Sequence, residues 1–295
     1  EAMVESFGSQ CGYCTPGFVM AMAAMLEEDA PLTRQGVKDG LTGNLCRCTG
    51  YEQIIEAALS LKGKPVTPIA ERYHDPQMFA ELEACAQDSV EIAYAESWGR
   101  ESRNVRIGIP ATVADAVAFK AKHKNVMVVS GGTDISVQMN KGKVEPDTLL
   151  SLVHLRELEG VQEAGGWLTI GAKATWTDVE RACSESLSEF QKIIQVFASV
   201  QIKNAGTLAG NVGNGSPIAD SMPFLYVMEA EVELTGPSGS RWVNLNRFYH
   251  GYKQLEMRPD ELITRLRLQR LKPEETLKLY KVSKRKDLDI STFTA

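Results

Sequence analysis

The sequence has few cysteines, histidines and aromatic residues, and it lacks a long apolar run. Six cysteines, four histidines and 7% aromatic residues occur among 295 residues, a composition that excludes a disulfide-rich scaffold. The longest nearly unbroken apolar stretch runs from Gly17 to Leu26, which is well short of the roughly 20 residues of a membrane-spanning helix. We therefore expect no membrane segment and no membrane partner.

The charge balance is acidic, and a long basic run is also lacking. The chain has 32 Lys and Arg against 38 Asp and Glu, which gives a formal net charge of -6. Because binding to nucleic-acid phosphates needs a surface rich in Lys and Arg, we expect no nucleic-acid partner. The length suits about two domains. The sequence starts at Glu1 without a leader, so we expect a cytoplasmic protein and a fragment with a missing beginning.

Four of the six cysteines gather near the start of the chain. Cys11 and Cys14 have CxxC spacing, Cys46 and Cys48 have CxC spacing, and 31 residues separate the two pairs. Without a secretory leader, closely spaced thiols favour metal ligands over disulfides. Four thiolates suit either structural zinc or an iron-sulfur cluster, and four structural thiols without metal are the third alternative.

The residues that flank the cysteines predict helices. Pro16 follows Cys14 and opens an apolar helix over 18–26, and Thr49 and Glu52 form a TxxE capping box for a helix after Cys48. Both pairs are thus expected at helix N-termini, where unpaired N–H groups favour an anionic site. The spacing alone leaves zinc and iron-sulfur open.

The middle of the chain has the composition of a connector. Residues 63–103 begin with Gly63, Pro65 and Pro68 and then become acidic, which predicts a linker. A short helix is expected from about Met78 to Ala86. We expect Cys85 to be an ordinary thiol.

From about residue 104 the pattern alternates between helix and strand. Thr112 and Asp115 predict a helix start, and a strand is predicted over 126–130. The strand is followed by Gly131-Gly132-Thr133-Asp134, where glycines allow backbone N–H groups to form an anion-binding concavity. The stretch is neither GxGxxG nor a Walker loop, and a simple turn is the alternative.

A second glycine-rich stretch runs over 204–220. We expect it to be an irregular functional segment, in which Thr207, Asn211 and Asp220 offer hydroxyl, amide and carboxylate groups. An amphipathic helix is predicted just before it, over 190–198. Phe197 in that helix is a core residue or packs against a planar ring. Cys183, in a helix opened by a capping box from Thr177 to Glu180, is expected to be a packing residue.

The cysteine segments resemble a known cofactor domain. GSQCGYCTPGFVM and GNLCRCTGY are similar to the second [2Fe-2S] domain, a small helical bundle, of the xanthine dehydrogenase and aldehyde oxidase family of molybdenum hydroxylases. The resemblance covers residues 1–62. It implies that Cys11, Cys14, Cys46 and Cys48 hold one [2Fe-2S] cluster rather than zinc, and that Gln10 faces the molybdopterin of a partner domain.

The later segments resemble the FAD-binding domain of the same family, which has a PCMH-type α+β fold. The family's TxGGN becomes Thr207-Leu208-Ala209-Gly210-Asn211, a change that is tolerated unless Ala209 needs a positive φ. The charged run over 283–289 resembles a loop beside the flavin, although a solvated charge run explains it equally well. The resemblance implies three groups of FAD contacts. The cradle for the FAD pyrophosphate would be formed by Val128, Val129, Ser130, Gly131, Gly132, Thr133, Asp134 and Ile135. A second set of contacts would come from Phe197, Ala198, Thr207, Gly210, Asn211 and Asp220, and Ile263 and Lys281 would lie near the flavin ring.

The resemblance as a whole implies an α+β chain with a helical [2Fe-2S] domain at 1–62, a linker at 63–103, an FAD-binding domain at 104–272 and the start of a truncated C-terminal α+β domain at 273–295. It also implies an oxidoreductase, namely the electron-transfer subunit of a hetero-oligomeric xanthine dehydrogenase. This subunit would carry electrons from a molybdopterin-binding large subunit through [2Fe-2S] and FAD to NAD+ in purine oxidation.

We expect no catalytic acid or base in this chain. The alternatives are the same role in an aldehyde, nicotinate or carbon monoxide hydroxylase, or a zinc-stabilised binding module. The family's N-terminal ferredoxin domain is not found before Glu1, which we attribute to truncation.

Overall fold

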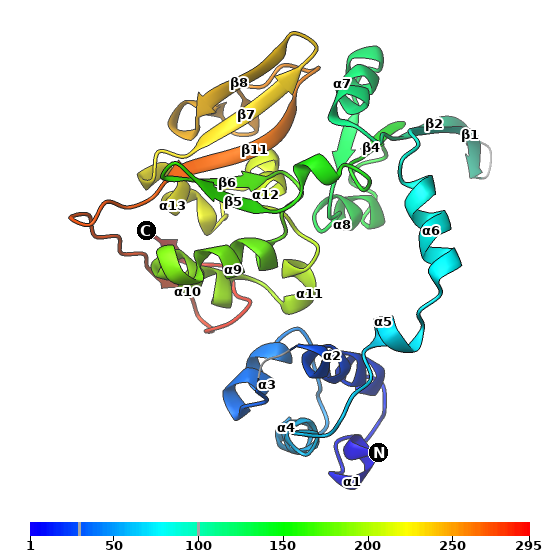
Figure 1. Cartoon of the computed structure of the whole chain (residues 1–295), viewed down its shortest axis with the longest axis vertical. Helices are drawn as coiled ribbons and strands as arrows, with labels where there is room; N and C mark the ends of the chain where they lie inside the picture. The colour runs from blue at the N-terminus through cyan, green and yellow to red at the C-terminus, as the bar shows by residue number, and fades with distance from the viewer. Residues whose placement is uncertain (29–30, 99–100) are drawn as a thin grey trace. The chain divides into compact units, whose positions relative to one another are not determined.

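The chain divides into two compact units in the computed structural model, which describes residues 1–28, 31–98 and 101–295 (Figure 1). The helical unit comprises residues 1–79 with 198–201, and the mixed unit comprises residues 80–197 with 202–295. Helices α6 and α11 each span a boundary between them. Of the linker expected at 63–103, residues 99 and 100 lie outside the described residues.

The helical unit packs short helices around a small apolar core. The side chains of Phe18 on α2, Val37 on α3 and Ile54 on α4 are fully buried in it. Arg34 at the start of α3 forms ion pairs with Glu52 and Glu56 of α4, the latter at 2.6 Å. The helices are α1 (Ala2–Glu5), α2 (Thr15–Glu27), α3 (Arg34–Gly40), α4 (Glu52–Leu59) and α5 (Ile69–Arg72).

The expected helix starts are half right in this unit. Cys14 is the N-cap of α2 and a proline stands in its first turn, as predicted. The capping box from Thr49 to Glu52 is wrong, because α4 begins at Glu52 with Tyr51 as its N-cap at φ 72°. The Thr49 hydroxyl instead contacts the Cys46 sulfur at 3.2 Å, so the cysteine takes the group that would have capped the helix.

The segment expected as a connector carries regular structure. Helix α6 (Pro76–Cys85) confirms the predicted short helix. Strand β1 (Val90–Trp98) was not expected, and it pairs antiparallel with β2 (Glu101–Ile109). Val90, Ile92 and Tyr94 alternate within an acidic composition, and this period of two is what a strand requires.

The described residues of the mixed unit form two larger sheets. The four-stranded sheet has the order β1-β2-β4-β3, with β4 parallel to both β2 and β3. The five-stranded sheet is antiparallel, with the order β5-β6-β11-β7-β8. Their further strands are β3 (Met127–Val129), β4 (Thr148–Ser151), β5 (Val161–Ala164), β6 (Trp167–Gly171), β7 (Glu231–Gly236), β8 (Gly239–Asn244) and β11 (Leu262–Gln269). Two small pairs are β9 (Tyr249–Gly251) with β10 (Gln254–Leu255) and β12 (Lys281–Val282) with β13 (Phe293–Thr294).

Most helix predictions in the mixed unit hold, with two corrections. The Thr112 hydroxyl caps α7 by accepting from the N–H of Asp115 at 3.1 Å, as expected. The capping box of α9 is formed by Thr175 and Asp178, two residues before the predicted pair, because the Thr177 hydroxyl bonds Asn204 instead. The helices and 3-10 turns are α7 (Val113–Lys122), α8 (Ile135–Asn140), η1 (Arg156–Leu158), α9 (Trp176–Ser186), α10 (Ser188–Phe197), α11 (Val200–Lys203), α12 (Leu208–Asn214), α13 (Ser221–Val227) and η2 (Leu245–Arg247).

The glycine-rich stretch at 204–220 is not irregular throughout. Residues 208–214 form α12, whose N-cap Thr207 accepts from the N–H of Gly210 at 3.0 Å. The cap and the buried side chains of Leu208 and Val212 offset the cost of glycine within a helix. The glycine-rich composition of the stretch led to the prediction of an irregular segment instead of this helix.

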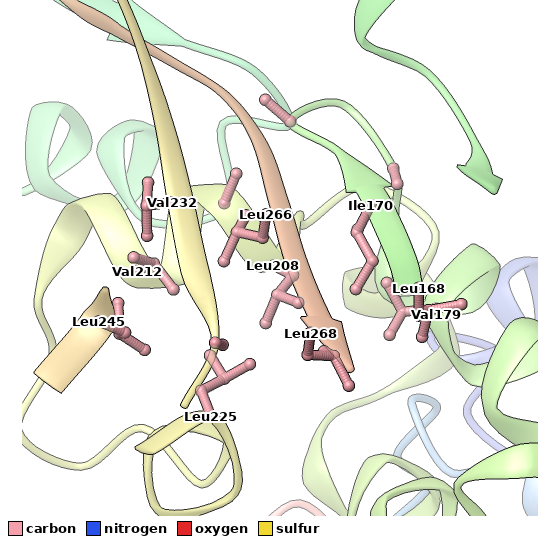
Figure 2. Packing of buried hydrophobic residues seen from close by; sticks show 14 of the residues in the cluster. Leu168, Ile170, Val179, Leu208, Val212, Leu225, Val232, Leu245, Leu266 and Leu268 are labelled. Carbon is pink, nitrogen blue, oxygen red and sulfur yellow. The ribbon is translucent and has the colours of Figure 1, made fainter. Parts of the chain in front are cut away.

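The core of the mixed unit lies on one face of the five-stranded sheet. Leu208 and Val212 of α12 lie beside Val232 of β7 and Leu266 of β11, and all four are fully buried (Figure 2). The same face carries Leu168, Ile170 and Leu268 from neighbouring strands, with Val179 of α9 nearby (Figure 2). Alternation along these strands therefore produces one apolar face.

The opposite face is polar and carries a stacked cation. The guanidinium of Arg267 lies 4.4 Å from the ring centre of Trp167 and 4.0 Å from that of Trp242. Its Nε donates to the carboxylate of Glu231 at 2.6 Å. The partly buried arginine thus joins strands β6, β11, β7 and β8 across this face.

We expect Phe224→Ala on α13 to lower the free energy of unfolding by about 3–5 kcal/mol. The Phe224 ring stacks on Phe190 of α10 with centroids 3.8 Å apart, and both side chains are 1% exposed. Val227→Ala on the same helix is the control, because Val227 is 69% exposed and its change should cost a few tenths of a kcal/mol, about the size of ordinary surface substitutions. Equal losses for the two variants in urea unfolding would contradict the assignment of this core.

Candidate cofactor-binding sites

The four clustered cysteines form two pairs in the helical unit. The sulfurs of Cys11 and Cys48 lie 3.6 Å apart, and the side chains of Cys14 and Cys46 also interact. Two sulfurs bound to one tetrahedral ion at about 2.3 Å lie about 3.8 Å apart, so the first pair has the spacing of two ligands on one metal. Within the described ranges no larger group of His, Cys, Asp or Glu is arranged as a closed ligand set.

The surroundings of the thiols favour the thiolate form at two positions. A hydrogen bond with the Thr49 hydroxyl, followed by the Thr49 N–H, lowers the pKa of Cys46 to about 7. The N–H of Tyr13 and the Cys48 thiol lower the pKa of Cys11. Burial raises the pKa of Cys14. Because the thiolate is the metal ligand, the donor set fits a cation-containing cluster. Gln10 is exposed beside Cys11.

A cavity of about 590 Å³ lies in the mixed unit. Its volume falls in the range of cofactor and ligand sites. Most of the residues expected to contact FAD line it: Val128, Val129, Ser130, Gly131, Gly132, Thr133, Asp134 and Ile135 from β3, its following loop and α8; Phe197; Thr207, Gly210 and Asn211; and Ile263. Ala198, Asp220 and Lys281 are not part of its wall.

The two glycine-rich segments meet at Gly131. A Cβ at this position would overlap the carbonyl oxygen of Ala205, so only glycine allows the two backbones to approach so closely. Gly132 has a φ of 70°, which strains any other residue. The wall between these segments is therefore mostly backbone, which leaves N–H groups near a ligand without intervening side chains.

Polar and aromatic groups of the wall are held in place by neighbours. The oxygen of the Asn211 side chain accepts from the Ser221 hydroxyl at 2.7 Å. Phe197 packs on Trp176 with ring centroids 4.7 Å apart, and the backbone N–H of Trp176 donates to the carbonyl of Gly206 at 2.9 Å. Phe197 is thus a packing residue that also lines the cavity, and its contact with a planar ring stays a prediction.

Ile263 reaches the cavity because of a bulge in β11. Strict alternation along this strand would place Ile263 on the polar face with Arg265 and Arg267. The pairing register shifts between Ile263 and Arg265, so that Ile263 pairs with Leu234 of β7. The extra residue, Thr264, turns Ile263 back towards the apolar side.

Ala209 stands where the family has a second glycine. It lies inside α12 and is 5% exposed. Among the described residues that have a positive φ, Ala209 does not occur. The substitution is therefore compatible with the turn, as expected.

Asp220 and Lys281 are paired with one another. The Lys281 ammonium donates to the Asp220 carboxylate at 2.7 Å, and the two side chains are 3% and 6% exposed. The same carboxylate accepts from the hydroxyls of Thr294, at 2.7 Å, and Ser291. Asp220 therefore fastens the segments around β12 and β13 to the start of α13. In the charged run over 283–289, Arg285 and Asp289 form an exposed ion pair at 3.1 Å.

Several cavity residues were not anticipated from the sequence. They are Lys120, Gln138, Leu152, Ala172, Trp176, Ile202, Lys253, Met257, Glu261 and Leu262. One of them carries a signal in its spacing, because Lys120 follows Val113, Ala116 and Val117 at i+7, i+4 and i+3 on the buried side of α7. We find no comparable sequence signal for Trp176 or Met257.

Comparison with protein families now identifies the two units. Residues 103–269 match the FAD binding domain in molybdopterin dehydrogenase, and residues 1–59 match a [2Fe-2S] binding domain. The chain belongs to the molybdopterin dehydrogenase family. Its fold is a helical [2Fe-2S] domain followed by an α+β FAD-binding domain, as the resemblance implied. The match to a [2Fe-2S] domain favours iron-sulfur over the zinc-stabilised module.

Individual relatives agree with this assignment. Xanthine dehydrogenase of Emericella nidulans is 27% identical over 340 residues, which cover 98% of this chain and 25% of that protein. A crystal structure of a Cu,Mo-CO dehydrogenase is 30% identical, with a TM-score of 0.60, over 64% of this chain and 66% of that chain. Quinoline 2-oxidoreductase of Pseudomonas putida 86 shares the fold, with a TM-score of 0.59 at 19% identity over 63% of this chain and 65% of that chain.

The chain spans about a quarter of the length of the curated relatives it matches. No helix in the described ranges has the length and apolarity needed to cross a bilayer.

We expect Gly131→Ala to weaken FAD binding by at least about tenfold and to lower stability by about 1–3 kcal/mol. The added methyl group must displace the carbonyl of Ala205 and so open the glycine wall. Gly251→Ala is the matched control, since its Cβ meets only the end of the Gln254 side chain at 3.2 Å. Flavin fluorescence titration and thermal unfolding measure both effects, and unchanged FAD affinity in Gly131→Ala would refute a tight backbone wall.

We expect Asp220→Asn to destabilise the chain by about 3–5 kcal/mol, because the buried Lys281 loses its counter-charge. Glu275→Gln is the control, since Glu275 and Lys272 form an exposed pair at 3.8 Å that is worth under about 1 kcal/mol. Urea unfolding without flavin measures the difference. A small stability loss together with weaker FAD binding would instead make Asp220 a direct flavin contact.

Proposed function

We propose that this chain is the iron-sulfur and flavin electron-transfer part of a molybdenum hydroxylase of the xanthine dehydrogenase type. Its partner would be a molybdopterin-binding large subunit in a hetero-oligomer. The substrate class would be purines, and NAD+ would be the final acceptor. We place the protein in the cytoplasm.

One observation carries the proposal. The similarity to xanthine dehydrogenase runs through 98% of the chain, and so through both cofactor domains in one polypeptide. The similarity to Cu,Mo-CO dehydrogenase covers 64% of the chain. Fusion of the two domains in this order supports the xanthine dehydrogenase type over the carbon monoxide type. The 30% identity to the latter keeps carbon monoxide oxidation as the second candidate.

The proposed cofactor-binding residues belong to two sites. Cys11, Cys14, Cys46 and Cys48 would hold the [2Fe-2S] cluster, and Gln10 would face the partner's molybdopterin. The glycine wall and the cavity residues named above would hold FAD. Ala198, Asp220 and Lys281 would support FAD binding without lining the cavity. A [2Fe-2S] cluster supplies one-electron chemistry and a flavin exchanges electrons singly or as a hydride. The side chains bind, orient and shield these groups, and we assign no catalytic acid or base.

The proposal is tested by the contents and activity of the purified protein. Iron with acid-labile sulfide and a flavin spectrum are expected, whereas zinc without flavin would overturn it. Co-expression with the molybdopterin subunit then allows NADH formation to be measured with purines, aldehydes, N-heterocycles and carbon monoxide. Activity confined to carbon monoxide or aldehydes would replace the purine assignment while keeping the cofactor roles.

We expect Cys14→Ala to reduce bound iron and acid-labile sulfide from about two per chain to near zero, since four thiolates hold a [2Fe-2S] cluster and alanine has no donor atom. FAD content should stay unchanged, because the flavin cavity is lined by the mixed unit alone. Cys85→Ala, which removes an exposed thiol, is the control and should retain iron. Iron retained in full in Cys14→Ala would exclude this cysteine as a ligand.

A further inference from the structure

Lys120 is an unusual residue in the cavity wall. It is 8% exposed and projects from the apolar side of α7. Lysines are almost never so buried unless they have a partner, and burial lowers the pKa of this one. Its ammonium donates to the carbonyl of Pro259. The carboxylates of Asp260 and Glu261 oppose this lowering. Because an ammonium has three donors, the hydrogen bond to Pro259 leaves it able to donate further.

The wall around Lys120 differs from the glycine wall. We call Lys120, Met257, Glu261 and Leu262 the α7 wall; all four line the cavity. Both carboxylate oxygens of Glu261 are bound by Arg241, at 2.7 and 2.9 Å. Arg241 thereby lowers the pKa of Glu261, and the retained negative charge disfavours a phosphate here. Apolar side chains beside a buried donor suit a flat heterocycle with acceptor nitrogens.

The aromatic pair of Trp176 and Phe197 lies with the glycine segments instead. A Cβ on Gly206 would lie 3.2 Å from the Thr133 hydroxyl and 3.3 Å from Trp176, so these residues converge. The cavity is thus lined by a phosphate-compatible backbone wall next to aromatic rings and, in addition, by the α7 wall with its buried lysine. A dinucleotide has two heterocycles joined by phosphates, and the aromatic pair suits the larger flavin ring.

We propose that Lys120 binds the adenine of FAD and thereby selects the dinucleotide over flavin mononucleotide. Its ammonium donates to an acceptor nitrogen of the purine while the apolar side chains of the α7 wall cover the ring. This inference rests on the proposed FAD function and adds to it a residue that determines cofactor specificity.

The test compares the affinities of FAD, FMN and ADP for the full chain. Lys120→Met keeps the length of the side chain and removes the donor. We expect about tenfold or greater loss of FAD and ADP affinity, the size of one hydrogen bond to a charged group, with FMN affinity changed by less than about twofold. Lys122→Met on the same helix is the control, because Lys122 is 66% exposed. Equal weakening of FAD and FMN, or no weakening, would overturn the inference in favour of a structural lysine.

A measurement on the unaltered chain covers the case in which Lys120→Met does not fold. FAD should slow amide hydrogen exchange in residues 113–122 and 257–262, and FMN should not. Protection of these segments by FMN would place the flavin ring at the α7 wall and overturn the inference. Failure of the unaltered chain to bind either flavin would instead refute the proposed function itself.

Discussion

The contact between the backbones at Gly131 and Ala205 is the constraint on which the flavin-binding unit depends. It brings the end of β3 against a segment more than 70 residues later in the chain, where even a methyl group would overlap the Ala205 carbonyl. Around it, the backbone N–H of Trp176 donates to the carbonyl of Gly206, and Thr207 caps α12. The cavity wall follows from this approach, since the β3–α8 and α11–α12 connections, without large side chains, can surround a ligand with N–H groups.

The five-stranded sheet supports that wall through its two unlike faces. The apolar face packs α12 and so fixes the segment from Thr207 to Asn211 that follows the close contact. The polar face is joined by Arg267 between Trp167 and Trp242. The bulge at Thr264 is the one irregularity in β11 that the pairing records, and it turns Ile263 into the cavity. A local break in the alternation of side chains along β11 thus places one residue of the sheet in the cavity wall.

The sequence predicts the elements whose signals are local. The Thr112 cap, the short helix near Met78 and the helix ending at Phe197 need only neighbouring residues. It fails where another group takes a hydroxyl that could have capped a helix: Cys46, three residues away, contacts the Thr49 hydroxyl, and the distant Asn204 accepts from that of Thr177. The cavity residues in the two glycine-rich segments could be predicted because they follow one another in the sequence. Trp176 and Met257 could not, because only the fold brings them to the cavity.

The partners of the buried charged residues in the mixed unit distinguish structural residues from a candidate binding residue. Lys203, Asp220, Glu233 and Glu261 each bond an opposite charge, and such a pair resists disruption because removing one member leaves the other unsatisfied in a low dielectric. Among the buried charged residues of the described chain, Lys120 differs, since its hydrogen-bond acceptor is a neutral carbonyl. Two carboxylates, Asp260 and then Glu261, act on it through space and raise its pKa against the effect of burial, but Glu261 is bound by Arg241. A buried ammonium that donates to a neutral carbonyl keeps donors that a neutral heterocycle in the cavity can use.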